Sequence, residues 1–181
     1  SDLYSQPMGL IYTRSITDPL WGARATYRSE SADAAVLTVK DRGGGFVILP
    51  GTYYSDARDQ GASQATLARV RVPYSAGGGT GSVGALLSDR TYEDGSSNRT
   101  AAVDGQYKPN DDSRLRAQLS ASQTDDRVLR SKSDGHAGYV DALYDNGTYH
   151  GWLGLAKVSP KFRSDNSIIT QSGYDWAKFE A

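Results

Sequence analysis

Hydrophobic and polar residues alternate with a period of two along most of the chain. In residues 65–74, ATLARVRVPY, the side chains of Val70 and Val72 point to one face and those of Arg69 and Arg71 to the other. The same alternation recurs in residues 20–28, 34–42, 82–90, 100–108 and 114–122, and more loosely in 136–144, 151–159 and 167–179. A period of two is typical of β-strands, and no segment has a helical period. We expect an all-β protein of about ten strands, counting a weaker first strand at residues 8–15.

The two faces of these strands differ in an unusual way. One face carries small apolar residues, and the other carries too many charges for the core of a soluble protein. The apolar face is predicted to be exposed to lipid or solvent, at Ala23, Ala25, Leu37, Val70, Val72, Val103, Ala117 and Leu119. The charged face is predicted to line the lumen of a barrel, with Arg24, Arg28, Lys40, Arg69, Arg71, Arg90, Lys108 and Arg116 against fewer acids such as Asp104 and Asp141. A one-layer sheet or a solvent-filled soluble barrel is the alternative that keeps this face in water.

The connections between the strands alternate between short and long. Residues 29–33, 73–81, 108–113 and 144–148 are short and rich in turn formers, and Asn146-Gly147 is a strong hairpin turn. Longer polar stretches, at residues 43–63, 92–99, 124–135 and 159–166, separate them. Short turns at one end and long loops at the other are typical of outer-membrane barrels. The sequence therefore predicts an antiparallel up-and-down transmembrane β-barrel, with residues 1–181 as about ten strands of a larger barrel.

The stretch GTGSVG, residues 79–84, matches the G-x-G-x-x-G pattern of dinucleotide-binding sites. That pattern binds a pyrophosphate only where a helix follows it. Here alternating residues precede and follow the glycines, so we expect a hairpin turn and no nucleotide.

Aromatic residues gather towards the predicted strand ends. Such girdles lie at the headgroup level of a membrane, although tyrosine is also simply a good strand residue. The candidates are Tyr27, Tyr74, Tyr107 and Tyr144 beside the short turns, and Trp21 and Tyr92 at the other end.

Composition removes several classes of function. The net charge is −1, which gives no electrostatic basis for nucleic-acid binding, and there is no cysteine for disulfide or thiol chemistry. Neither H-E-x-x-H nor G-x-S-x-G occurs, and the two histidines, His136 and His150, are expected about one strand length apart, so no catalytic residue, cofactor or metal site is predicted. A weak surface calcium site at Asp125, Asp126 and Asp134 is the alternative for the paired carboxylates.

Four stretches resemble the barrel region of a family of Gram-negative outer-membrane proteins. They are residues 11–29, 37–51, 84–99 and 158–176, and the most specific match is a strand-entry motif carried by Pro160, Phe162, Arg163 and Asp165. The family is a domain of unknown function described as carbohydrate-binding-family-nine-like, after the β-sandwich that precedes its barrel. Here NSI stands where the family usually has a small residue, Gly and Phe, and no sandwich precedes the match. The resemblance implies a fragment of a longer chain in the outer membrane, and no catalytic residues.

Two functions remain open on these observations. The first is a channel or translocation pore, for saccharide-like solutes if the family's description is meaningful, in which the inward arginines select anions. The second is a structural barrel, closed inside by Arg–Asp pairs, that anchors a surface or secretion complex. In both, membrane lipid and lipopolysaccharide are the expected surroundings, with partner proteins of an outer-membrane complex beside them. The apolar run Phe46, Val47, Ile48 and Leu49 is expected in a loop that folds over the mouth, packs on the barrel or docks a partner.

Overall fold

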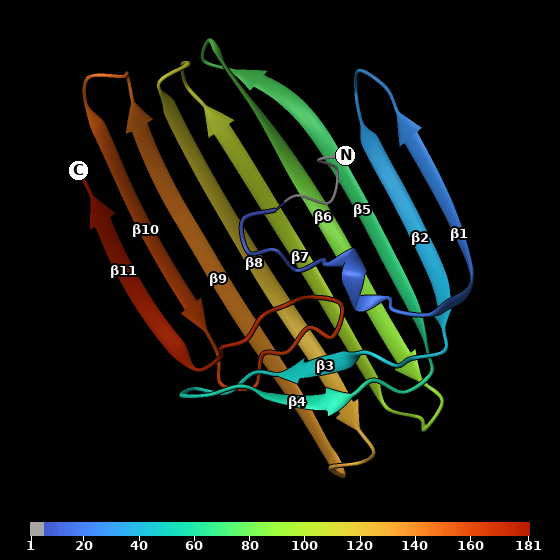
Figure 1. Cartoon of the computed structure of the whole chain (residues 1–181). Helices are drawn as coiled ribbons and strands as arrows, with labels where there is room; N and C mark the ends of the chain where they lie inside the picture. The colour runs from blue at the N-terminus through green and yellow to red at the C-terminus, as the bar shows by residue number, and fades with distance from the viewer. Residues whose placement is uncertain (1–5) are drawn as a thin grey trace.

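The computed structural model describes residues 6–181, which form one large antiparallel β-sheet and a separate short hairpin (Figure 1). The nine strands of the sheet are β1 (Pro19–Arg28), β2 (Asp33–Asp41), β5 (Ser63–Ala76), β6 (Gly79–Tyr92), β7 (Ser97–Lys108), β8 (Ser113–Asp126), β9 (Ser131–Asp145), β10 (His150–Val158) and β11 (Tyr174–Glu180). They lie side by side in chain order, with only the hairpin of β3 (Phe46–Leu49) and β4 (Asp56–Asp59) inserted between β2 and β5. The prediction of an all-β meander is confirmed. Within residues 6–181 the sheet does not close, because β1 and β11 are its two edges.

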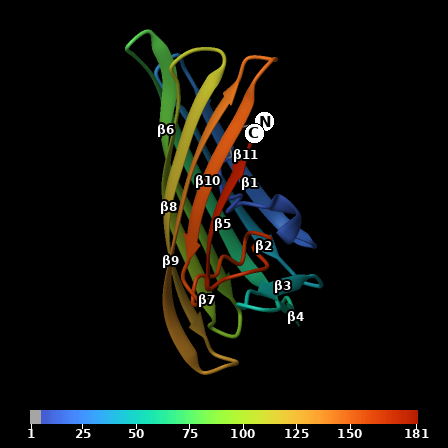
Figure 2. The same cartoon turned by 90° about the vertical axis from the view of Figure 1, so that its left-hand side faces the viewer.

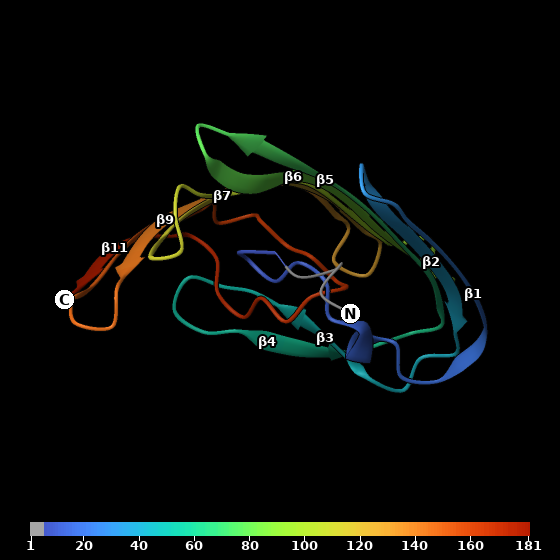
Figure 3. The same ribbon diagram turned by 90° about the horizontal axis from the view of Figure 1, so that it is seen from above.

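The sheet is strongly curved, so it has a convex and a concave face. Viewed from above, the N-terminal segment of residues 6–18, the β3–β4 hairpin and the segment of residues 159–173 all lie inside the arc of the sheet (Figure 3). The side view shows the same segments on one side of the sheet only (Figure 2). The concave face is therefore covered by the chain's own segments at mid-height and below, and the convex face is bare.

The alternation along the strands places apolar side chains outside and polar side chains inside. On β8, Leu115, Ala117, Leu119 and Ala121 are exposed on the convex face. On the concave face of the same strand the side chains are polar and buried, namely Gln118, Ser120, Ser122, Thr124 and Asp126. This is the reverse of a soluble sheet, which buries its apolar face. The predicted exposure is correct for Ala23, Ala25, Val70, Val72, Val103, Ala117 and Leu119.

In β2 the predicted orientation is wrong. Leu37 pairs with Leu67 of β5, which is buried on the concave face, whereas Lys40 lies on the convex face and binds Glu93 at 2.7 Å. Both faces of β2 carry apolar residues, so the period alone fits either orientation. The choice is made by Asp41, whose carboxylate must face inward to accept hydrogen bonds from the backbone N–H groups of residues 17, 18 and 43.

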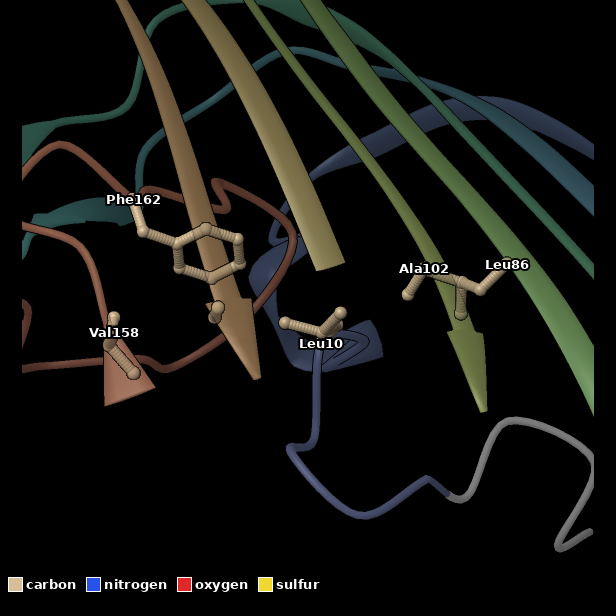
Figure 4. Packing of buried hydrophobic residues seen from close by; sticks show 6 residues of the cluster. Leu10, Leu86, Ala102, Val158 and Phe162 are labelled. Atoms are coloured by element: carbon tan, nitrogen blue, oxygen red, sulfur yellow. The ribbon is translucent and has the colours of Figure 1, made fainter. Parts of the chain in front are cut away.

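The hydrophobic core is small and lies on the concave side, where the covering segments meet the sheet (Figure 4). Leu10 of the N-terminal segment and Phe162 of the 159–173 segment are fully buried there against Leu86, Ala102 and Val158. The predicted strand at residues 8–15 is wrong. Its backbone bonds to the interior instead of to a neighbouring strand: Met8 N donates to the Gln118 side chain and Tyr12 N to the Asn166 carbonyl, and a 3₁₀ turn, η2 (Thr13–Ser15), follows.

The two ends of the sheet have different connections. At the short-turn end, residues 29–32, 77–78, 109–112 and 146–149 join neighbouring strands. At the opposite, long-connection end, residues 42–62 contain the β3–β4 hairpin and residues 159–173 cover the sheet, but 93–96 and 127–130 are only four residues each, because β6 to β9 run further than predicted. The alternation of short and long connections is therefore correct only in part.

The glycines of residues 77–84 have a structural explanation. Gly77 and Gly78 form the hairpin turn, at φ 58° and 81°, and β6 begins at Gly79, so the hairpin is confirmed with its turn two residues earlier than GTGSVG. On the convex face, Tyr74 reaches across Gly81 to stack on Tyr107, with ring centroids 6.2 Å apart. On the concave face, the Arg69 guanidinium lies over Gly84, where a Cβ atom would be 2.7 Å from its nitrogens. Glycine leaves room where a long side chain crosses a strand.

Replacing Gly84 with alanine is expected to destabilise the sheet by about 1–3 kcal/mol, because the added methyl group occupies the space of the Arg69 guanidinium. The free energy of unfolding from urea titrations measures this. Gly105→Ala on β7 is the matched control, since a Cβ there has its nearest neighbour at 3.6 Å, an ordinary contact. Equal stability of the two variants would contradict the crossing role of Gly84.

Candidate functional site

The concave face towards the short-turn end is lined by arginine–aspartate pairs. Arg69 of β5 binds Asp104 of β7 with both terminal nitrogens, and Arg116 of β8 binds Asp141 of β9 with Nε at 2.9 Å. Arg71 binds Asp33 of β2 at 2.8 Å. The pairs join neighbouring strands or cross one strand, so they form a ladder across the sheet. Each arginine is neutralised by a carboxylate, which favours the ladder over an uncompensated ring of positive charge.

A polar cavity of about 280 Å³ opens on this ladder. Its lining includes Arg69, Arg71 and Arg116, the carboxylate of Asp104, and Gln6 and Pro7 from the N-terminal segment. The cavity is large enough for a small polar solute and presents both donors and acceptors to it.

The strand register places the predicted inward residues, with one exception, on the concave face. Those on it are Arg24, Arg28, Arg69, Arg71, Arg90, Lys108, Arg116, Asp104 and Asp141. Lys40 is the exception and lies on the convex face, as described above for β2. The residues on the concave face do not form one site, because Arg90 lies at the long-connection end, in a separate buried network.

That network is built around the segment Phe162–Asn166. The Arg163 guanidinium bridges two buried carboxylates, Asp165 at 2.6 Å and Asp126 at 2.9 Å. Arg58 of the β3–β4 hairpin donates from Nη1 to both carboxylate oxygens of Asp126. The Tyr92 hydroxyl donates to Asp165 at 2.7 Å. Residues far apart in the sequence are thus held by one continuous set of charged hydrogen bonds. The segment that carried the family resemblance is the centre of this set.

Arg90 and Asn98 add hydrogen bonds to the same segment, Arg90 to a side chain and Asn98 to the backbone. Arg90 is fully buried and its Nε donates to the Asn166 side chain at 2.8 Å, while Asn98 bonds both to the Arg163 carbonyl and to the Asp165 N–H. Every one of residues 162–167 is buried. The long-connection end of the concave face is therefore closed by hydrogen bonds, not only by contact.

The protonation states of Asp126 and Tyr92 in this network follow from burial and from their hydrogen-bond partners. Burial by itself would raise the pKa of the Asp126 carboxyl, but the hydrogen bonds from Arg58, the Leu129 N–H and Arg163 outweigh it and hold that pKa well below its ordinary value. Burial, with the nearby Asp165 carboxylate, raises the pKa of Tyr92 far above its ordinary value. Asp126 is therefore ionised and Tyr92 neutral at physiological pH.

The predicted mouth-loop residues form strand β3 of the short hairpin. Val47 is buried, Ile48 and Leu49 are half-buried, and Phe46 is exposed. The hairpin lies across the concave side at the long-connection end (Figure 1), where its Arg58 joins the network described above. Of the three roles expected for this run, this arrangement matches packing on the chain's own sheet.

The aromatic residues fall into an outer and an inner group. Tyr27, Tyr74, Tyr107 and Tyr144 lie on the convex face towards the short-turn end, and Trp21 lies on the same face nearer the other end. Tyr92 was expected in the outer girdle, but it is buried on the concave face, because it pairs with buried Ser63 and binds Asp165. The inner group, Tyr139, Trp152 and Trp176, was not predicted. The sequence of β10 does carry a signal for it. Trp152, Gly154 and Ala156 alternate with Leu153 and Leu155, so Trp152 points to the face that the two leucines do not occupy.

The remaining chemical alternatives find little support in residues 6–181. No three His, Cys, Asp or Glu side chains in this range are grouped to hold a metal ion. Asp125 instead binds Lys132 at 3.0 Å, and Asp126 binds the two arginines named above. In the same range, no helix is both long and apolar enough to cross a membrane.

In comparisons with family models, with characterised proteins and with solved structures, none matches the chain.

Replacing Arg163 with methionine is expected to cost about 3–5 kcal/mol, because Asp165 would keep a buried charge without its main partner. The measurement is the midpoint of urea unfolding together with the rate of proteolysis in residues 159–173. Lys161→Met is the control, since Lys161 is an exposed cation in the same segment. If both variants unfold and are cleaved alike, Arg163 does not hold the segment on the sheet.

Proposed function

We propose that this chain forms part of the wall of a β-barrel in the outer membrane of a Gram-negative cell, with its convex face towards lipid and lipopolysaccharide. The observation that carries this proposal is the bare apolar convex face, with Leu87 and Leu119 more than 60% exposed at its centre. A soluble monomer rarely leaves so large an apolar surface in water. Shallow apolar grooves on this face, one of them lined by Val70, Val72, Val83, Val103 and Leu119, suit lipid acyl chains.

The limits of the apolar surface also support a membrane location. Towards the short-turn end it is bordered by the row of tyrosines. Towards the other end, Leu87 is followed on the convex face by Asp89, which binds Arg99 at 2.8 Å, and Ala121 is followed by Gln123. On β10 the apolar positions already end at Leu155, before Lys157. The border of the apolar surface thus lies nearer the short-turn end on β10 than on β6. This is expected where strands are tilted to the membrane normal.

Replacing Leu119 with arginine is expected to destabilise the membrane-inserted protein by about 2–4 kcal/mol, the cost of a cation near the middle of the bilayer. Folding into phosphatidylcholine vesicles, followed by urea titration, measures it. Gln123→Arg is the matched control on the same strand and face, because it lies beyond the apolar band beside Asp134. Equal stability of the two variants in vesicles would rule out a lipid-facing convex surface.

The function we propose for this barrel is the passage of small polar solutes. Its support is the polar cavity on the arginine–aspartate ladder at the short-turn end. The resemblance to the carbohydrate-binding-family-nine-like outer-membrane proteins suggests saccharide-like solutes. No catalytic step is part of the proposal.

A second candidate is a structural barrel that anchors partner proteins of an outer-membrane complex. The observation that favours it is the closure of the long-connection end by residues 162–167, all of them buried and bonded to the sheet. A barrel closed in this way conducts only if the segment leaves a path beside it or moves.

Replacing Arg71 with glutamine separates the two functions. In a channel, the change removes a positive charge from the lining of the cavity, so the reversal potential in planar bilayers should shift towards cation preference. Arg99→Gln is the control, because it breaks a similar pair on the convex face. A barrel that inserts but carries no current, or that keeps its selectivity in the Arg71 variant, would leave the anchoring function.

A further inference from the structure

Three aromatic side chains converge on the concave face of the last strands of the sheet. Trp152 of β10 and Trp176 of β11 have ring centroids 6.0 Å apart, and Tyr139 of β9 meets Trp176 edge-on at 6.2 Å. Gly154 makes this possible, because a Cβ there would lie 2.5 Å from the Trp152 ring and 2.9 Å from the Trp176 ring. We call these three side chains the aromatic platform.

The polar edges of the platform are fixed by one carboxylate. Asp141 accepts hydrogen bonds from Trp152 Nε1 and from the Tyr139 hydroxyl, each at 3.1 Å, and it is also paired with Arg116. The rings are therefore held in place through their polar atoms. All three residues of the platform remain partly exposed. A rigid aromatic surface in a polar face is a preorganised binding surface.

Basic groups lie on and beside the platform. The Lys178 ammonium lies over the Trp176 ring, 5.6 Å from its centroid. Arg114 is in register with Trp152 through Leu143, and its Nε is buried without a hydrogen-bond partner among the described residues. Two acids lie near these cations. Asp141 already accepts hydrogen bonds from three side chains, and Glu180, which is in register with Trp152, is exposed to solvent. Lys178 and Arg114 can therefore act as donors to an anionic ligand.

We propose that the aromatic platform binds an acidic saccharide, a sugar ring that carries a carboxylate. The C–H face of the ring packs on the exposed part of the indoles, and its carboxylate pairs with Arg114, whose Nε has no hydrogen-bond partner among the described residues. Lys178 adds positive charge over the Trp176 ring. This proposal deepens the proposed function, on which it rests, by naming the class of solute. The solute would lie between the short turns and the buried network around Phe162–Asn166.

The test is a fluorescence titration of the folded chain in detergent, on a Trp21→Phe background. Trp21 lies on the convex face, and its replacement leaves Trp152 and Trp176 as the two tryptophans whose emission is followed. Trigalacturonic acid is expected to quench or shift this emission and to bind about tenfold more tightly than maltotriose, the effect of one additional charged hydrogen bond. Absence of any change with trigalacturonic acid, or equal affinity for the two sugars, would overturn the proposal.

Two variants test the contributions of the cations and of the aromatic rings separately. Lys178→Gln combined with Arg114→Gln is expected to lower the affinity for trigalacturonic acid about tenfold and to leave that for maltotriose unchanged. Gly154→Ala keeps these charges but displaces both rings, so it is expected to weaken both sugars. Lys157→Gln, an exposed cation on the convex face of β10, is the control and should bind as the parent does. Wild-type affinity in both test variants would also overturn the proposal.

Conductance distinguishes this proposal from the function it rests on. A barrel that carries selective current but whose tryptophans do not respond to either sugar retains the channel function and loses the saccharide site. Binding without current retains the site and removes the channel.

Discussion

The fold depends on pairing the charges that the concave face buries. A guanidinium or carboxylate removed from water costs several kcal/mol unless a partner and further hydrogen bonds replace the lost hydration. Arg163 meets this requirement for two carboxylates, Asp126 and Asp165, and Arg58 and Tyr92 complete their coordination. Because these partners come from the hairpin, the sheet and the 159–173 segment, the same bonds that satisfy the charges also fix the covering segments on the sheet.

Side chains that cross a neighbouring strand are the second constraint, and it explains the composition of that strand. Arg69 reaches Asp104 only over Gly84, and Tyr74 reaches Tyr107 only over Gly81, so β6 carries glycines on both faces. Gly154 likewise leaves room for Trp152 and Trp176, which meet across the adjacent strands β10 and β11. A glycine pattern that resembles a nucleotide-binding motif is thus a consequence of long side chains that pair across strands. The six residues GTGSVG alone do not distinguish these two causes, whereas the alternation of the residues on either side does.

The sequence predicted the sheet and the faces of most strands, because period two and turn residues are local properties. It failed where the decision is made by distant residues. Asp41 sets the orientation of β2 through the backbone of residues 17, 18 and 43, and Asp165 draws Tyr92 inward. Residues 8–15 alternate like a strand, yet their hydrogen bonds go to Gln118 and Asn166. The arginines were identified from their position in the strands, but their carboxylate partners follow only from the register.

The two ends of the concave face differ in what remains for a ligand. At the long-connection end, the side chains of Arg163, Asp126 and Asp165 are bonded to one another and buried, so this end serves stability. Buried polar atoms without a hydrogen-bond partner among the described residues occur at both ends, Arg90 Nη1 at the long-connection end and Arg114 Nε at the short-turn end. The short-turn end differs because the arginine–aspartate ladder there borders a polar cavity of about 280 Å³. The cavity, and not an unpartnered donor alone, is therefore what leaves room for a ligand at this end.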